Sequence, residues 1–145
     1  MITDEIAAGL GRALDVCEEL GIGAVELRTI DGVQIVDQAP EALQALRQEL
    51  DARGFEVCSI ASPFLKCHRA DDPLVQEQVH ERALQAATVL SAPVVRAFAY
   101  WREADPSAAL PDIGSALNRA AALASDAGVT LAPENEHECV VALTP

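Results

Sequence analysis

The sequence is poor in positive charge. Its 145 residues contain 10 Lys and Arg against 23 Asp and Glu, which gives a formal net charge of -13 at pH 7. Such a surface repels polyanions on average, so we expect neither nucleic acid nor a membrane surface as a partner. A small phosphate-bearing ligand is still compatible with this charge, because a few local arginines can hold one phosphate.

Long apolar runs and paired cysteines are also missing. No apolar run approaches the roughly 18 residues that a membrane helix needs, and the residues after Met1 include Asp4 and Glu5 instead of a basic, apolar signal sequence. We therefore expect the cytoplasm as the location. The four cysteines, at positions 17, 58, 67 and 139, form no C-x-x-C pair. Their spacing encodes neither a zinc knuckle nor a disulfide scaffold, so reduced thiols are expected.

Four helix-like segments alternate with four short apolar runs. The expected helices span residues 4–20, 40–54, 72–90 and 111–128, and the expected strands span residues 24–28, 55–61, 94–100 and 129–133. Strands that alternate with helices in this way are typical of a parallel sheet built from βα units. No linker or low-complexity segment interrupts the pattern, so residues 1–145 are expected to form a single domain.

Four βα units are half of a closed barrel. An eight-stranded barrel typically needs about 250 residues, so the predicted fold is α/β, an incomplete TIM-type (β/α) barrel with four parallel strands and four helices. Left open, such a sheet would expose two edges and the apolar inner face that a barrel normally buries. We expect this exposure to favour a homodimer formed through the open sheet edges.

Charged residues interrupt or follow three of the apolar runs. Glu26 and Arg28 alternate with apolar residues in the first, Arg96 lies in the third, and Glu134 follows the fourth. Residues two apart in a strand share a face, and the C-terminal ends of barrel strands surround the active site. The charges therefore predict a site at this rim. A structural ion pair, such as Glu26 with Arg96, is the competing interpretation.

Four motifs carry a family resemblance. They are residues 25–28 (VELR), 61–66 (ASPFLK), 95–98 (VRAF) and 131–137 (LAPENEH). In this order they resemble successive strand-end motifs of the sugar phosphate isomerase/epimerase family, which is similar to xylose isomerase. That family includes tagatose and psicose epimerases and the endonuclease IV type of DNA-repair enzyme. The match covers nearly the whole chain and corresponds to strands two to five of the family's barrel.

The resemblance implies a divalent-metal site for Mn, Mg, Co or Zn at the barrel mouth, built from two glutamates, an aspartate and a histidine. Of these ligands, only the first glutamate has a counterpart here, Glu134, and the other three would lie beyond Pro145. One carboxylate does not bind Mn²⁺ or Mg²⁺ at useful affinity against water. We therefore expect that this chain alone does not hold the metal.

The resemblance also implies the chemistry of a sugar or sugar phosphate isomerase/epimerase. In a complete relative, carboxylate bases and the metal move a proton on a ketose or aldose through an enediolate. Glu134 would be both catalytic base and metal ligand. The candidate substrate-binding residues are Glu26, Arg28, Lys66, Arg96 and His137. For Lys66 and His137, a solvated loop position is the competing interpretation.

Two other functions are weighed against this one. The first is a non-catalytic half-barrel module, two copies of which would self-associate into an eight-stranded, two-fold symmetric shell. The second is DNA repair of the endonuclease IV type, which the negative charge disfavours. Elsewhere in the chain, we expect Phe98 to pack in the core. His80, among charged neighbours in a helix, is expected to face solvent.

Overall fold

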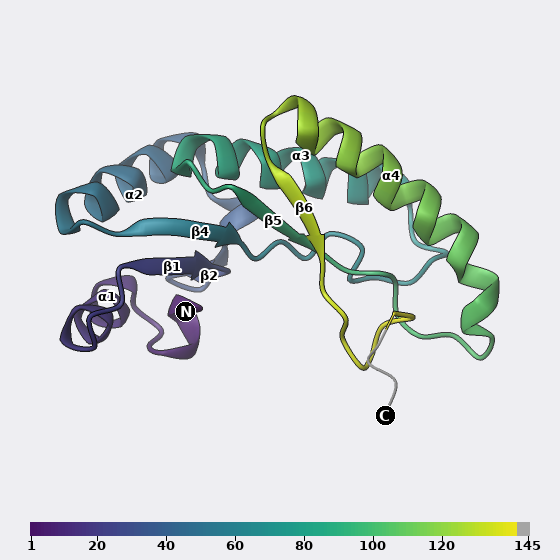
Figure 1. The fold of residues 1–145 in the computed structure, drawn as a ribbon, viewed down its shortest axis with the longest axis horizontal. Coiled ribbons are helices and arrows are strands. Elements are labelled where there is room, and N and C mark those ends of the chain that lie inside the picture. Colours follow the sequence, from purple (N-terminus) through teal and green to yellow (C-terminus); the bar gives the residue numbers. More distant parts are fainter. Residues whose placement is uncertain (142–145) are drawn as a thin grey trace.

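The computed structural model describes residues 1–141, and the end of the predicted single domain, residues 142–145, lies outside the described residues. Within this range the four main strands alternate with four helices: α1 (Leu10–Glu19), β1 (Ala24–Leu27), α2 (Pro40–Arg53), β4 (Glu56–Ile60), α3 (Pro73–Leu90), β5 (Val94–Ala97), α4 (Leu110–Asp126) and β6 (Thr130–Pro133). The strands form one parallel sheet in the order β1-β4-β5-β6 (Figure 1). The predicted half barrel is therefore confirmed.

Turn-forming residues set several helix ends where the sequence predicts them. Pro40 stands in the first turn of α2, and Gly54 ends this helix with a φ of 75°. Such left-handed backbone is least costly for glycine. At the start of α3, the Asp72 carboxylate accepts a hydrogen bond of 3.0 Å from the backbone N–H of Leu74. Among residues 1–141, no helix has the length and apolar content to cross a membrane.

The first helix is shorter than predicted. Instead of one helix over residues 4–20, a single 3-10 turn spans Thr3–Glu5, and α1 begins only at Leu10. The reason is a tertiary contact, because the acidic side chains of the 3-10 turn bind Arg28 at the end of β1. This contact folds the N-terminal segment back against the sheet.

A small hairpin after β1 is not predicted. Strands β2 (Thr29–Ile30) and β3 (Val33–Gln34) pair antiparallel, and a 3-10 turn over Ile35–Asp37 leads into α2. Asp31 and Gly32, which connect the two strands, have φ values of 50° and 83°. Asp-Gly is a strong hairpin signal, but strands of two residues are too short to give a periodic pattern.

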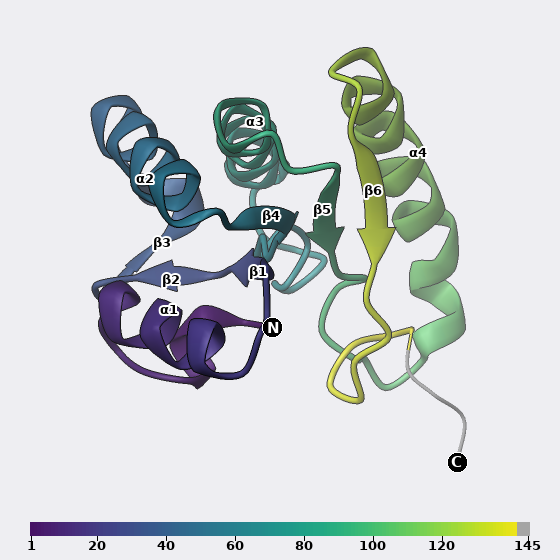
Figure 2. The same cartoon turned by 60° about the vertical axis from the view of Figure 1, so that its left-hand side comes forward.

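The helices lie outside the curved sheet, and its concave side carries no helix in the described chain (Figure 2). The strand residues that face the helices form the centre of the apolar core, with exposures of 0 to 3%: Val25, Leu27, Val57, Ile60, Val95 and Ala97. Burial of this face supplies most of the driving force for folding.

The concave face carries charged side chains among apolar ones, where an apolar surface is predicted. A hollow of about 390 Å³ on it is lined by Glu26, Ser59, Val94, Arg96, Ala132 and Glu134, together with Ile2 and Pro133. None of the exposed large hydrophobic residues found among residues 1–141 belongs to this sheet. The inner face is therefore mixed and not wholly apolar, because Glu26, Arg96 and Glu134 lie on it beside apolar residues such as Val94 and Ala132.

The two edges of the sheet differ as well. The N-terminal segment runs beside β1: Ile2 forms a parallel bridge with Glu26, whose N–H donates a hydrogen bond of 2.8 Å to the carbonyl of Met1. On the other side, β6 pairs only with β5 within residues 1–141. One of the two predicted open edges is thus partly covered, and the other is open.

Candidate active-site rim

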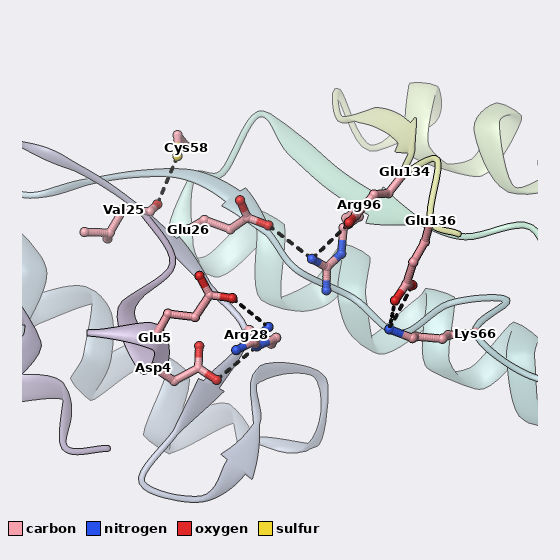
Figure 3. Close-up of polar contacts among 10 residues, drawn as sticks. All are labelled: Asp4, Glu5, Val25, Glu26, Arg28, Cys58, Lys66, Arg96, Glu134 and Glu136. Atoms are coloured by element: carbon pink, nitrogen blue, oxygen red, sulfur yellow. Dashed lines mark hydrogen bonds and ion pairs between the residues drawn. The ribbon is translucent and has the colours of Figure 1, made fainter. Parts of the chain in front are cut away.

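Three of the predicted site residues meet on the concave face. Glu26 lies in β1, Arg96 in β5, and Glu134 directly follows β6. The Nη1 atom of Arg96 lies 3.1 Å from Oε2 of Glu134 and 3.8 Å from Oε1 of Glu26 (Figure 3). One guanidinium nitrogen therefore contacts two carboxylates, one in β1 and one directly after β6. We call these three residues the rim triad.

The rim triad is partly withdrawn from solvent. The side chain of Arg96 is 16% exposed and that of Glu26 is 24% exposed, whereas Glu134 is 43% exposed. Charges in such a setting interact more strongly than charges in open water. The guanidinium carbon of Arg96 also lies 4.9 Å from the centre of the Phe98 ring, a cation–π distance. Arg96 is therefore held in the middle of the rim.

A second charged pair lies beside the triad. The ammonium of Lys66 is 2.9 Å from each oxygen of the Glu136 carboxylate (Figure 3). It also lies 4.7 Å from the centre of the Phe98 ring and 5.5 Å from that of Trp101. Lys66 thus lies in a loop with its side chain 32% exposed and paired with Glu136, and Phe98 is buried as predicted. Sequence reasoning missed Glu136, although its position two residues after Glu134 placed it in the same loop.

Arg28 faces different partners from those of Arg96. Its Nε lies 3.0 Å from Oδ2 of Asp4, and its Nη1 lies 3.2 Å from Oε1 of Glu5 (Figure 3). The hydrogen bond with Asp4 is the main cause that raises the pKa of Arg28. The two acidic partners were not predicted, because only the folding back of the N-terminal segment brings them to β1.

One cavity joins these charged groups. It measures about 290 Å³, close to the lower end of the roughly 300–1,000 Å³ typical of small-molecule sites. Its lining includes Arg28, Lys66, Arg96, Phe98, Glu134 and Glu136. Four of these residues were predicted to bind substrate or to act on it. The cavity therefore offers hydrogen-bond donors, acceptors and one aromatic ring to a small polar ligand.

His137 lies outside this cavity. It is exposed and lines a separate surface hollow with His68, Trp101, Arg102 and Glu138. The structure thus does not bring His137 into either hollow that Glu134 lines. The backbone turns at residues 137–138, where the N–H of Cys139 bonds to the carbonyl of Glu136, and the spacing of Glu134 and His137 does not reveal this turn.

His80 is buried, contrary to the prediction of a solvent-facing side chain. It is 2% exposed, its Nε2 shares a hydrogen bond of 3.0 Å with the carbonyl of Ala120 in α4, and its ring packs against Phe64. Burial lowers its pKa. It lines a second cavity of about 280 Å³ between α3 and α4. The charged neighbours of His80 in the sequence face solvent, and the helix turns the imidazole toward α4.

A divalent metal does not fit the described residues alone. Among residues 1–141, no three His, Cys, Asp or Glu side chains lie together in an arrangement that could hold a metal ion. The carboxylate of Glu134, the one ligand that the resemblance implies, already has the guanidinium of Arg96 as a partner. Divalent cations such as Mg²⁺ and Ca²⁺ need several oxygen ligands, and Zn²⁺ needs three or four protein ligands.

The same fold occurs in solved structures of sugar epimerases. An L-ribulose 3-epimerase matches 96% of this chain with 50% of its own, at a TM-score of 0.72 and 19% identity. A D-psicose 3-epimerase solved with D-fructose matches 95% of this chain with 51% of its own, at a TM-score of 0.70 and 21% identity. The chain thus spans about half the length of these relatives, and at such identities the likeness shows the fold alone.

A structure from Thermus thermophilus is similar too. This protein, soaked with ZnCl₂, matches 95% of the chain with 55% of its own, at a TM-score of 0.70 and 21% identity. No curated protein sequence matches the chain. The family model described as "Xylose isomerase-like TIM barrel", in contrast, matches residues 14–143. The chain therefore belongs to the xylose isomerase-like TIM-barrel family.

Proposed function

We propose that this chain supplies one half of the active site of a sugar isomerase or epimerase, with Glu134 as a proton-transferring base. The observation that supports it is the meeting of Glu26, Arg96 and Glu134 at the carboxyl ends of parallel strands in a xylose isomerase-like fold. Sites in barrels of this type lie at that end. A carboxylate there can take a proton from one carbon of a ketose or aldose and return it through an enediolate.

The other cavity residues have binding roles in this proposal. Arg96 and Lys66 donate hydrogen bonds to sugar oxygens, and the ring of Phe98 gives the sugar an apolar surface. Glu26, in β1, keeps the guanidinium of Arg96 at the rim through its contact with Nη1. Arg28 lines the same cavity but is bound to the N-terminal segment.

Charge pairing favours a neutral sugar over a sugar phosphate. Each of the three cations in the cavity, Arg28, Lys66 and Arg96, already has at least one carboxylate within 3.2 Å. A phosphate would have to displace one of these carboxylates and would meet the others as like charges. A hydroxyl group can instead accept from the cations and donate to the carboxylates without separating them.

The proposed site belongs to a complete barrel. Glu134 would contribute one ligand to a divalent metal such as Mn, Mg, Co or Zn, and the remaining ligands would come from the other half. The relative soaked with ZnCl₂ is in line with metal use in the family. We keep the cytoplasm and the absence of a nucleic-acid partner as predictions.

Proton transfer can be tested by exchange with solvent. The chain is incubated in D₂O with D-psicose, L-ribulose or D-tagatose, with and without added Mn²⁺, and deuterium in the sugar is measured by mass spectrometry. Because the chain carries only half of the site, we expect slow incorporation at the carbon beside the carbonyl, above that in buffer alone, and its return to the buffer level in Glu134→Gln. Glu138→Gln is the matched control, because this glutamate lies in the same loop but outside the cavity. Equal incorporation with the chain and with Glu134→Gln in both conditions would refute the proposal.

Self-association is the second candidate function, and the edge of β6 favours it. Within residues 1–141 this edge has no neighbour, and an unpaired edge strand is a template for another chain. Two copies could pair β6 of each with the β1 side of the other and close a two-fold symmetric shell. Sedimentation equilibrium should then report a dimer. A monomer at all concentrations would contradict this second proposal and leave the first one untouched.

A further inference from the structure

Two loops beside the cavity run side by side beyond the ends of their strands. They are the loop after β4 (residues 61–72) and the segment after β5 (residues 98–109). Three backbone N–H groups of the second donate to three carbonyls of the first over 2.8 to 2.9 Å: Phe98 to Phe64, Tyr100 to Leu65, and Trp101 to Cys67. This pairing continues the parallel order of the two strands and sets which residues of the loops face each other.

Arg69 extends this pairing with its side chain. Its Nε and Nη2 each lie 3.1 Å from one oxygen of the Glu103 carboxylate, so the contact is bidentate. Its Nη1 lies 2.9 Å from Oδ2 of Asp112, in the first turn of α4, and 3.4 Å from the carbonyl of Ala108. A bidentate contact of arginine with a carboxylate fixes the relative orientation of the two groups. One guanidinium therefore joins the loop after β4 to the segment after β5 and to α4.

Lys66 lies three residues before Arg69 in the same loop. Its ammonium is 4.7 Å from the centre of the Phe98 ring and 5.5 Å from that of Trp101, and both rings belong to the segment after β5. The ammonium also pairs with Glu136 in the cavity (Figure 3). If one loop shifts along the other, the ammonium moves away from the two rings. The place of Lys66 in the cavity therefore depends on the register of the two loops.

The paired loops contain strained backbone. Leu65 and Tyr100, which are hydrogen-bonded to each other, have φ values of 61° and 49°. Such left-handed backbone is costly for residues other than glycine and persists only where neighbouring contacts hold it. Contacts that join the two loops, as those of Arg69 do, stabilise this conformation.

We propose that Arg69 is a positioning residue of the sugar site, which fixes the register of the two loops and so keeps the ammonium of Lys66 over the Phe98 ring. Arg69 itself does not line the cavity. The inference rests on the proposed function, in which Lys66 donates to sugar oxygens. Loss of the Arg69 contacts should loosen the two loops while the sheet stays folded, because partly exposed ion pairs add little to global stability.

Two residues that occur once in the sequence report on these loops. Lys66 is its only lysine, and Trp101 is its only tryptophan. In a chain labelled with ¹³C-lysine, the ε-methylene protons of Lys66 report the nearby rings, because protons above an aromatic ring are shielded. Quenching of Trp101 fluorescence by acrylamide reports how open the segment after β5 is to solvent.

The main variant is Arg69→Met, which retains an unbranched side chain without the charge and the donors. We expect the ε-methylene protons of Lys66 to lose more than about half of their upfield offset from free lysine, and the quenching of Trp101 to rise about twofold. The urea midpoint should change little. Arg69→Lys keeps the charge but not the bidentate contact, so it should restore the native quenching only in part.

Arg53→Met is the matched control. Arg53 also binds two carboxylates, those of Asp15 and Glu18 at 2.8 and 2.9 Å, but these contacts join α2 to α1. The control should leave the signals of Lys66 and Trp101 unchanged. Glu103→Met removes the bidentate contact from the other side and should reproduce most of the effect of Arg69→Met. In the double variant the two effects should not add, because both act on one pair.

Unchanged signals of Lys66 and Trp101 in Arg69→Met would overturn the inference, whatever happens to the urea midpoint. Equal changes in Arg53→Met would overturn it as well, because they would show a general response to the loss of an arginine. None of these measurements uses a sugar. Failure here and failure of the proposed proton exchange are therefore distinguishable.

Discussion

The two faces of the four-stranded sheet come from the same short strands and differ in almost every property. The helix-covered face consists of fully buried aliphatic residues such as Leu27, Ile60 and Val95. The concave face carries the rim triad in a hollow open to solvent. Alternate residues of each strand thus face either the core, where they stabilise the fold, or the concave side, where they can contact a ligand. Substitutions on the first face should change the free energy of unfolding, and those on the second should change ligand binding.

The largest expected effect is on the helix-covered face. Ile60→Ala removes a side chain with 0% exposure from the core and should lower the free energy of unfolding by about 3 kcal/mol. Ser59→Ala, one residue earlier and on the concave face, should change it by less than about 0.5 kcal/mol. Urea denaturation measures both values. Similar losses in the two variants would show that the faces do not differ in this way.

The burial of His80 predicts a pH effect in the helical layer. Because burial lowers the pKa of His80 below its usual 6.5, the unfolded chain binds more protons than the folded one as the pH falls. The stability contribution is therefore full above pH 6.5 and is lost as the pH falls from there toward the folded-state pKa. Urea midpoints followed through this range should decline, and His80→Leu should flatten the decline. An identical pH dependence in His80→Leu would contradict the buried neutral imidazole.

The N-terminal end of α3 gives a smaller effect. Asp72→Ala removes the carboxylate that accepts from the N–H of Leu74, and should lower the free energy of unfolding by about 1 kcal/mol. Asp72→Asn retains an acceptor and should recover most of this loss. Thermal or urea unfolding measures the difference. If the asparagine variant is as unstable as the alanine variant, the cap does not act through this hydrogen bond.

The smallest expected effect is local and concerns the covered edge of the sheet. Arg28→Met breaks the contacts with Asp4 and Glu5, so residues 1–5 should detach from β1 more often. Hydrogen exchange at the N–H of Glu26, which is bound to the carbonyl of Met1, should become faster while exchange in β5 is unchanged. Unchanged protection of Glu26 would show that Arg28 does not hold the N-terminal segment.

Local patterns predicted the repeating part of this molecule. Helical periodicity and the helix start and stop signals at Pro40, Asp72 and Gly54 located most helices, because these signals act within a few residues. Alternation in the first strand predicted that Glu26 and Arg28 share a face, and the position of the charges at strand ends predicted that Glu26, Arg96 and Glu134 meet at one rim. The features that the sequence did not reveal depend on contacts between distant segments.

Two examples show why distant contacts escape prediction. His80 looks exposed beside Glu77 and Glu81, and only the position of Ala120 in the next helix explains its burial. Lys66 lies in a loop, and its ion pair with Glu136, 70 residues later in the chain, is not visible in the sequence. Neither pairing has a signature in spacing or composition.

The central claim is that the concave rim is where a sugar binds. The most direct measurement is a titration of the isotopically labelled chain with D-psicose, followed by amide chemical shifts in two-dimensional NMR. The account predicts shifts concentrated at Lys66, Arg96, Phe98 and Glu134, with the cavity beside His80 unaffected. Shifts at the α3–α4 cavity instead, or none at the rim, would contradict it.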